Sequence, residues 1–191
     1  MAINLQKGQR IDIGLTKMTI GLGWDPNDGT GYDFDLDASA IMIDSQRKLV
    51  TEDYFIFYNN LNSPDGALTH TGDDPSGKNS NGDDDEAIMI DLSKVDSRVE
   101  EILFVVTIED FERRKQNFGQ VRNSYIRIVD QSNNQEIAKY ELDEDFSIET
   151  GIEFGRLYKK SGSWKFEASG IGYRADLGFF LEKYYNGQII K

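Results

Sequence analysis

The chain is a succession of short runs rich in aromatic and β-branched residues, and the runs are separated by glycine, asparagine, aspartate and serine. Such runs are typical of strands, and many short strands at this spacing favour an antiparallel sandwich or barrel over a parallel α/β sheet. The pattern predicts strands over residues 9–13, 17–22, 33–43, 53–58, 67–70, 87–91, 101–108, 125–129, 136–142, 151–158 and 163–168. We therefore expect an all-β fold, an antiparallel β-sandwich.

Two segments indicate short helices at the periphery of this sandwich. Residues 109–116 are charged and compact, and residues 176–185 carry apolar side chains at helical spacing. No internal repeat, low-complexity tract or long linker divides the sequence, so residues 1–191 are predicted to form one domain. In the C-terminal helix one stripe is expected to pack against a sheet, formed by Leu177, Phe180, Leu181 and Tyr184.

Charge and composition exclude several classes of protein. The chain has 34 acidic and 21 basic side chains and a formal net charge of −13, so a nucleic-acid partner is not expected. The absence of cysteine excludes disulfides, zinc-thiolate sites and cysteine nucleophiles.

No run approaches the roughly 18 apolar residues of a membrane span, and the start has no signal-peptide pattern. A cytoplasmic protein is the expectation.

The carboxylates are concentrated in two stretches, residues 25–37 and residues 73–86. The first stretch contains no lysine or arginine, and in the second only Lys78 opposes the acidic side chains. Solvated loops that keep a protein soluble are the simplest interpretation of such acidic runs. The order of residues within the first stretch argues against that interpretation.

Residues 33–38 read Asp-Phe-Asp-Leu-Asp-Ala, which is the alternation that a strand requires. On a strand, the apolar residues would face the core, and Asp33, Asp35 and Asp37 would share the other face about 7 Å apart. Two unit charges at that distance repel by about 2 kcal/mol at an effective dielectric constant of ~20. A divalent cation between the carboxylates would offset this repulsion, so the pattern predicts a metal site.

The ligand types restrict which ion this site would hold. Oxygen donors in excess, with no cysteine and one histidine, suit Ca²⁺, Mg²⁺ or Mn²⁺ rather than zinc or copper. Calcium tolerates loose geometry and therefore suits loops better than magnesium. The site is not an EF-hand, because the sixth and twelfth positions would be Ala38 and Asp44 instead of glycine and glutamate.

A series of motifs runs through the chain in a fixed order, beginning with Gly21-Leu22-Gly23-Trp24-Asp25. It continues over residues 33–40, 57–61, 64–67, 69–73, 84–86, 106–108, 116–121 and 162–166. This series, which spans nearly the whole chain, resembles the TerD family of bacterial tellurium-resistance and general stress proteins.

The resemblance implies a β-sandwich that binds two calcium ions at one end and has no enzymatic activity of its own. It also implies a cytoplasmic protein, or one peripheral to the inner membrane, that acts in complexes with other Ter-type stress proteins. By the matching motifs, the implied calcium ligands are Asp25, Asp33, Asp35, Asp37, Asn60, Asp65, Asp73, Asp84, Asp85 and Glu86.

Two other functions compete with a calcium-binding stress module. A metal-dependent phosphoester hydrolase could use the clustered aspartates, although no lysine, arginine or hydroxyl cradle stands near them in the sequence. A C2-like membrane binder could share calcium with lipid headgroups, but it lacks apolar or basic loop residues. Residues 113–115, the one basic run, are interpreted as a solvated helix end, and His70 as a structural hydrogen-bonding residue.

Overall fold

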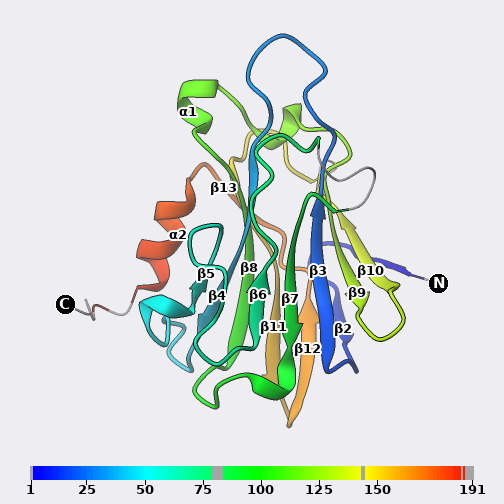
Figure 1. Cartoon of the computed structure of the whole chain (residues 1–191), viewed down its shortest axis with the longest axis vertical. Coiled ribbons are helices and arrows are strands. Elements are labelled where there is room, and N and C mark those ends of the chain that lie inside the picture. Colours follow the sequence, from blue (N-terminus) through cyan, green and yellow to red (C-terminus); the bar gives the residue numbers. More distant parts are fainter. Residues whose placement is uncertain (1, 79–83, 143–144, 186, 188–191) are drawn as a thin grey trace.

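The computed structural model describes residues 2–78, 84–142, 145–185 and 187. The strands form two sheets that pack face to face (Figure 1). The first sheet has the strand order β1 (Ile3–Asn4), β10 (Gln135–Glu141), β9 (Tyr125–Asp130), β3 (Lys17–Gly23), β7 (Glu86–Asp91) and β6 (Leu68–His70). The predicted β-sandwich is confirmed.

The second sheet has the strand order β2 (Arg10–Asp12), β12 (Ser163–Glu167), β11 (Gly151–Lys160), β8 (Glu101–Ile108), β4 (Leu36–Ile43) and β5 (Phe55–Ile56). A further strand, β13 (Ile171–Tyr173), also pairs with β11. Among the described residues, β1 and β10 form the one parallel pair. The expected antiparallel pairing therefore describes nearly the whole fold.

The helical segments are shorter than the sequence pattern predicts. Of residues 109–116, only α1 (Phe111–Arg114) is an α-helix, and its ends at Asp110 and Lys115 both have left-handed backbone. The C-terminal helix α2 (Leu177–Tyr184) is capped at its N-terminus by Asp176, whose carboxylate accepts a hydrogen bond from the Phe179 N–H. Three 3₁₀ turns complete the described helices: η1 (Glu52–Tyr54), η2 (Leu92–Lys94) and η3 (Phe118–Gln120).

The core lies between the two sheets. Alternate apolar residues of β3 and β7 face those of β4, β8 and β11, and the rings of Phe104 and Phe154 stack with centroids 5.8 Å apart. Burial of this apolar surface is the main stabilising contribution to such a fold. The largest fully buried side chains are Phe104, Phe118, Phe154, Phe166, Phe180, Met18, Leu22, Leu36, Ile41, Met42, Ile43 and Leu49.

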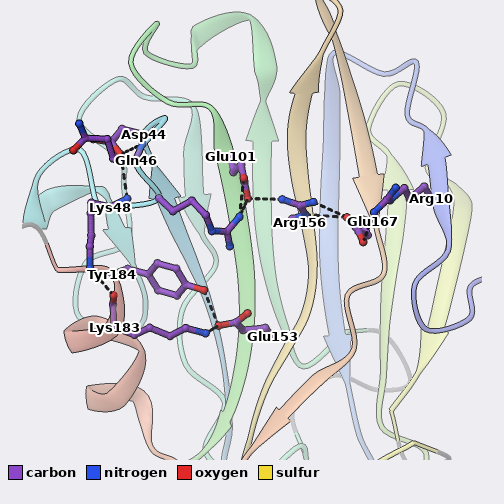
Figure 2. Close-up of polar contacts among 11 residues, drawn as sticks. Arg10, Asp44, Gln46, Lys48, Glu101, Glu153, Arg156, Glu167, Lys183 and Tyr184 are labelled. Carbon is purple, nitrogen blue, oxygen red and sulfur yellow. Dashed lines mark hydrogen bonds and ion pairs between the residues drawn. The ribbon is translucent and has the colours of Figure 1, made fainter.

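Polar contacts attach α2 to the second sheet (Figure 2). The Glu153 carboxylate on β11 is almost fully buried and accepts hydrogen bonds from Lys183 at 2.5 Å and Tyr184 at 2.8 Å. Phe180 and Tyr184 are buried as predicted, but Leu181 is 38% exposed, so the predicted apolar stripe is wrong at that position. Polar contacts with Glu153 accompany the apolar contacts that dock this helix.

A line of ion pairs crosses the same sheet. Glu101 on β8 accepts hydrogen bonds from Arg47 and Arg156. Glu167 on β12 accepts them from Arg156 and Arg10 (Figure 2). The side chains alternate in charge, so each carboxylate lies between two guanidinium groups. Pairs that are partly exposed contribute little individually, but a network of this kind fixes the side chains on neighbouring strands relative to one another.

Candidate metal centre

Three of the predicted ligands lie together at one end of the second sheet. Asp35 directly precedes β4, Asp37 is the second residue of β4, and Asp73 lies in the loop that follows β6. Each offers a carboxylate oxygen within 4.8 Å of the oxygens of the other two. Asp35 and Asp37 are buried, whereas Asp73 is exposed and leaves the group open to solvent on one side.

Asp37 is the most strongly perturbed member of this group. Its side chain is 3% exposed, and Oδ2 has no hydrogen-bond partner among the described residues. Burial raises the pKa of Asp37 to about 9, and the nearby charges of Glu86 and Asp35 add to that shift. Burial also raises the pKa of Asp35, and this effect is opposed by Arg114. The group therefore favours either a proton or a metal cation.

Glu86, a predicted ligand, instead bonds to the backbone beside two members of the group. Its carboxylate accepts hydrogen bonds from the N–H of Ala38 at 2.8 Å and the N–H of Asp74 at 3.3 Å. Ala38 follows Asp37 in the chain, and Asp74 follows Asp73. Glu86 thus ties the two ligand-bearing segments together from β7, and its side chain is fully buried.

His70 also connects the segment that contains Asp37 with the segment that contains Asp73. Its Nδ1 accepts a hydrogen bond from the Gly72 N–H at 3.0 Å, so Nδ1 carries no proton and Nε2–H donates to the Ala38 carbonyl at 2.9 Å. This assignment makes the imidazole neutral, and its 3.6 Å distance to Glu86 is too long for a hydrogen bond. The predicted structural role of His70 is confirmed.

Three further side chains interact with the group. The sequence analysis did not identify Glu109 or Tyr58, and it interpreted residues 113–115 as a solvated helix end, which is wrong at Arg114 because this side chain is only 17% exposed. Arg114 donates from Nη1 to Asp35 Oδ2 at 3.1 Å. The charge of Glu109 raises the pKa values of Asp35 and Asp37, although in both cases it contributes less than burial. Burial raises the pKa of the Tyr58 phenol, and the charges of Glu109 and Asp37 raise it further.

The signal for these residues lies in the strand pairing. Leu36 pairs with Ile108, so the segment after β8 runs beside the segment before β4, and the Glu109 N–H donates to the Asp35 carbonyl at 2.8 Å. A pairing of residues 36–43 with 101–108 would have predicted this contact. Residues 25–37 contain no basic side chain in the sequence, but in the structure Arg114 reaches Asp35.

Asp33 lies outside the group of three. The strand predicted over residues 33–43 begins only at Leu36, because the carbonyls of Tyr32 and Asp33 accept hydrogen bonds from the Gln116 side chain instead of from a neighbouring strand. The Asp33 carboxylate is 41% exposed and pairs with Lys78 at 2.7 Å. The alternation of residues 33–38 is therefore strand-like only in its second half.

Asp84 and Asp85 bond to the first sheet. Asp84 accepts hydrogen bonds from Arg127 at 2.8 Å and from the Tyr125 hydroxyl at 3.2 Å. Asp85 accepts one from the Trp24 N–H at 2.9 Å. The structure does not bring these two carboxylates into the group of three, and Asp83 lies outside the described residues.

Three more implied ligands also have other contacts. Asp25 accepts a hydrogen bond from the Asn123 amide at 2.6 Å, and the Asn60 amide donates to the carbonyls of Asp53 and Phe55. Asp65 lies beyond the end of β6 opposite to Asp73 and accepts hydrogen bonds from the N–H groups of Ala67 and Asp96 and from the Ser63 hydroxyl. The structure does not bring any of the three into the group of Asp35, Asp37 and Asp73.

No helix in the described part of the chain is long and apolar enough to cross a membrane.

Comparison with known proteins gives concordant results. The model of the TerD domain family matches residues 1–184. General stress protein 16U of Bacillus subtilis is 46% identical over 191 residues, which covers 96% of this chain and 97% of that protein. Tellurium resistance protein TerD of Serratia marcescens is 44% identical over 189 residues, with coverages of 96% and 97%.

Solved structures show the same fold. The crystal structure of a homologue of the telluride resistance protein TerD from Streptomyces coelicolor superposes with a TM-score of 0.74. It covers 87% of this chain and 95% of the other, at 18% sequence identity. The two-sheet architecture is therefore shared despite low sequence identity.

Proposed function

We propose that this chain, which belongs to the TerD family, is a non-catalytic calcium-binding module of a bacterial stress response. The names of its relatives connect the family with tellurium resistance and general stress. We place the protein in the cytoplasm or peripheral to the inner membrane, where it acts through calcium-dependent complexes with other Ter-type stress proteins.

The buried Oδ2 of Asp37 is the observation that carries the metal proposal. An unpartnered carboxylate oxygen in a buried position is costly, and the cost rises with the two further carboxylates close to it. A divalent cation among Asp35, Asp37 and Asp73 would give this oxygen a partner and reduce the repulsion between the three groups. The donor set also fits the ion, because all three groups supply oxygen.

Calcium is the proposed ion because it takes six to eight oxygen ligands in flexible geometry. Asp73 lies in a loop and is exposed, so the remaining positions are accessible to water and to a partner protein. Two calcium ions would change the net charge from −13 to −9. The group of three supports one ion, and the second ion of this proposal rests on the family resemblance.

Calorimetric titration of chelator-stripped protein with Ca²⁺ and Mg²⁺ tests the metal proposal. We expect saturable Ca²⁺ binding that is strongly weakened in Asp37→Asn and Asp73→Asn and retained in Asp28→Asn, a matched change at an exposed aspartate. Asp65→Asn should leave Ca²⁺ binding by the group of Asp35, Asp37 and Asp73 unchanged, because Asp65 lies away from it. Equal heats for the wild type and Asp37→Asn would contradict the proposed site.

The partner proposal needs a separate measurement. Ter-type proteins should form complexes with the calcium-loaded protein and release it when chelator is added. Calcium-dependent pelleting with lipid vesicles in the absence of any partner would instead support the C2-like membrane binder.

Metal-dependent phosphoester hydrolysis is the second candidate, and Arg114 is the observation that favours it. A cation beside a metal is what a transferring phosphoryl group requires. However, Arg114 already pairs with Asp35 at 3.1 Å. Turnover of a phosphoester with Mg²⁺ or Mn²⁺ that is lost in Asp37→Asn would replace the non-catalytic module with this enzyme.

A further inference from the structure

We propose that Arg114 sets the cation affinity of the group of Asp35, Asp37 and Asp73, because its guanidinium competes with a bound cation for the carboxylate of Asp35. This inference rests on the proposed function and adds to it a residue that determines affinity. It predicts that cation binding and the Arg114–Asp35 ion pair weaken one another.

The position of Arg114 carries the first step. Its Nη1 lies 3.1 Å from Asp35 Oδ2, and the two side chains are only 17% and 11% exposed. An oxygen of Asp35 also lies within 4.8 Å of oxygens of Asp37 and Asp73, so the guanidinium borders the space that a cation would occupy. Solvent only weakly screens the repulsion between the Arg114 guanidinium and a bound cation, because the side chains of Asp35 and Asp37 are buried.

The second step concerns the alternatives open to Arg114. Its Nε is buried without a hydrogen-bond partner among the described residues, and the pair with Asp35 is a single contact instead of the two-pronged arrangement that arginine prefers. The guanidinium carbon also lies 5.9 Å from the centre of the Tyr32 ring. The side chain can therefore leave Asp35 without losing a complete set of hydrogen bonds, and it has an aromatic face beside it.

The neighbouring cations lack this relationship. Lys78 pairs with Asp33, and Arg113 pairs with Asp110 and lies over the Tyr32 ring. Among the ion pairs of the described residues, only that of Arg114 with Asp35 includes a member of the group of Asp35, Asp37 and Asp73. Lys115, the next residue, is exposed and offers a matched charge for comparison.

Thermodynamic linkage gives the expected consequences. If Arg114 lowers cation affinity by some factor, then a bound cation weakens the Arg114–Asp35 pair by the same factor. Binding of the cation would free Arg114, the last residue of α1, next to Tyr32, so this surface would change with cation occupancy. Coupling between two sites of this kind usually spans about 5–150-fold in affinity.

Calcium titrations of wild type, Arg114→Gln, Arg114→Lys and Lys115→Gln test the inference. We expect the Kd for Ca²⁺ to fall about tenfold in Arg114→Gln and to remain near the wild-type value in the other two variants. In an Asp35→Asn background, Arg114→Gln should change the Kd by less than about threefold, since the proposed effect acts through Asp35. Thermal unfolding of the calcium-free proteins identifies any variant that does not fold.

The wild-type protein gives a second measurement that does not depend on the variants folding. In NMR spectra, the Nε–H signal of Arg114 should shift as Ca²⁺ saturates the protein, whereas that of Arg156, which pairs with Glu101 and Glu167 away from every implied ligand, should not. An unchanged Kd in Arg114→Gln, an equal gain in Lys115→Gln, or a static Arg114 signal would each overturn the inference while leaving calcium binding intact. Absence of Ca²⁺ binding in every protein would overturn the proposed function and this inference with it.

Discussion

The carboxylate of Glu86, on one sheet, accepts a hydrogen bond at 2.8 Å from the backbone N–H of Ala38, on the other. This contact occurs where the edge strand β5 has ended, since β5 pairs with β4 only at Ala40 and Ile41. The unpaired N–H and carbonyl of Ala38 would otherwise be buried without partners, and Glu86 and His70 provide them. Side chains of the first sheet thus extend the hydrogen bonding of the second sheet beside Asp37.

Replacement of Glu86 by alanine should therefore destabilise the protein. The change leaves the buried N–H of Ala38 without its acceptor and removes the hydrogen bond from the Asp74 N–H, and we expect a loss of about 3 kcal/mol in the free energy of unfolding. Urea unfolding at equilibrium measures it. Glu112→Ala, at an exposed glutamate, is the control and should change stability by less than about 0.5 kcal/mol. Equal stabilities of the two variants would contradict the proposed role of Glu86.

The stability of the metal-free protein should decrease as pH rises. Burial is the main cause that raises the folded-state pKa of Asp37 to about 9, from the ordinary 3.8 of an aspartate. A group with a raised pKa contributes stability that is complete below its unfolded pKa and is lost as pH rises toward the folded pKa. Between pH 5 and pH 8 the free energy of unfolding should therefore fall by up to about 4 kcal/mol, at 1.36 kcal/mol per pKa unit.

Chemical unfolding at pH 5 and pH 8 in the presence of chelator checks this slope. Asp37→Asn should remove most of it, whereas the exposed Asp28→Asn should retain it. A slope that is the same in the wild type and Asp37→Asn would show that another group is responsible.

Most of the sandwich could be predicted from the sequence, because its long strands carry clear apolar runs and end at turn residues. The missed strands, β1 and β13, have only two and three residues, which is too short for alternation to be recognised. The strand predicted over residues 33–43 is wrong over its first three residues. The carbonyls of Tyr32 and Asp33 bond to the side chain of Gln116, a residue more than 80 positions away.

The candidate metal centre was predictable only in part, for a related reason. Residue type and local spacing identify Asp35, Asp37 and Asp73 as acidic residues in two stretches, but they do not distinguish them from Asp84 or Asp85. The contact of Arg114 with Asp35 depends on the register between β4 and β8 and on the short helix that follows. Contacts of this range are set by the tertiary structure and leave no local pattern.

Lys183→Met should weaken the attachment of α2 to the second sheet. The change keeps the aliphatic part of the side chain but leaves the buried Glu153 carboxylate with Tyr184 as its remaining described hydrogen-bond donor. Lys183 is partly exposed, so we expect a loss of about 2 kcal/mol, less than for a fully buried pair. Hydrogen exchange over residues 177–184 should accelerate. The control is Glu182→Gln on the exposed side of the helix, and equal exchange in both variants would contradict this attachment.

Gly21→Ala tests the role of the glycine in the Gly-Leu-Gly-Trp motif. A Cβ at Gly21 would lie 2.1 Å from Asp84 Oδ2, so the absence of a side chain leaves room for the carboxylate that Arg127 and Tyr125 hold. Forcing Asp84 aside breaks these hydrogen bonds, and we expect a loss of about 2 kcal/mol in the free energy of unfolding.

A second substitution separates this steric cause from a general effect of alanine on the strand. In Gly21→Ala/Asp84→Gly the clash is absent, so the two substitutions should be less destabilising together than the sum of the single variants. Gly178→Ala in the first turns of α2 controls for the change from glycine to alanine, because its Cβ would lie 3.3 Å from the nearest atom. Strict additivity of the Gly21→Ala and Asp84→Gly effects in urea unfolding would refute the steric explanation. In that case the close approach of Asp84 would not explain why residue 21 is a glycine, and the glycine would need another physical cause.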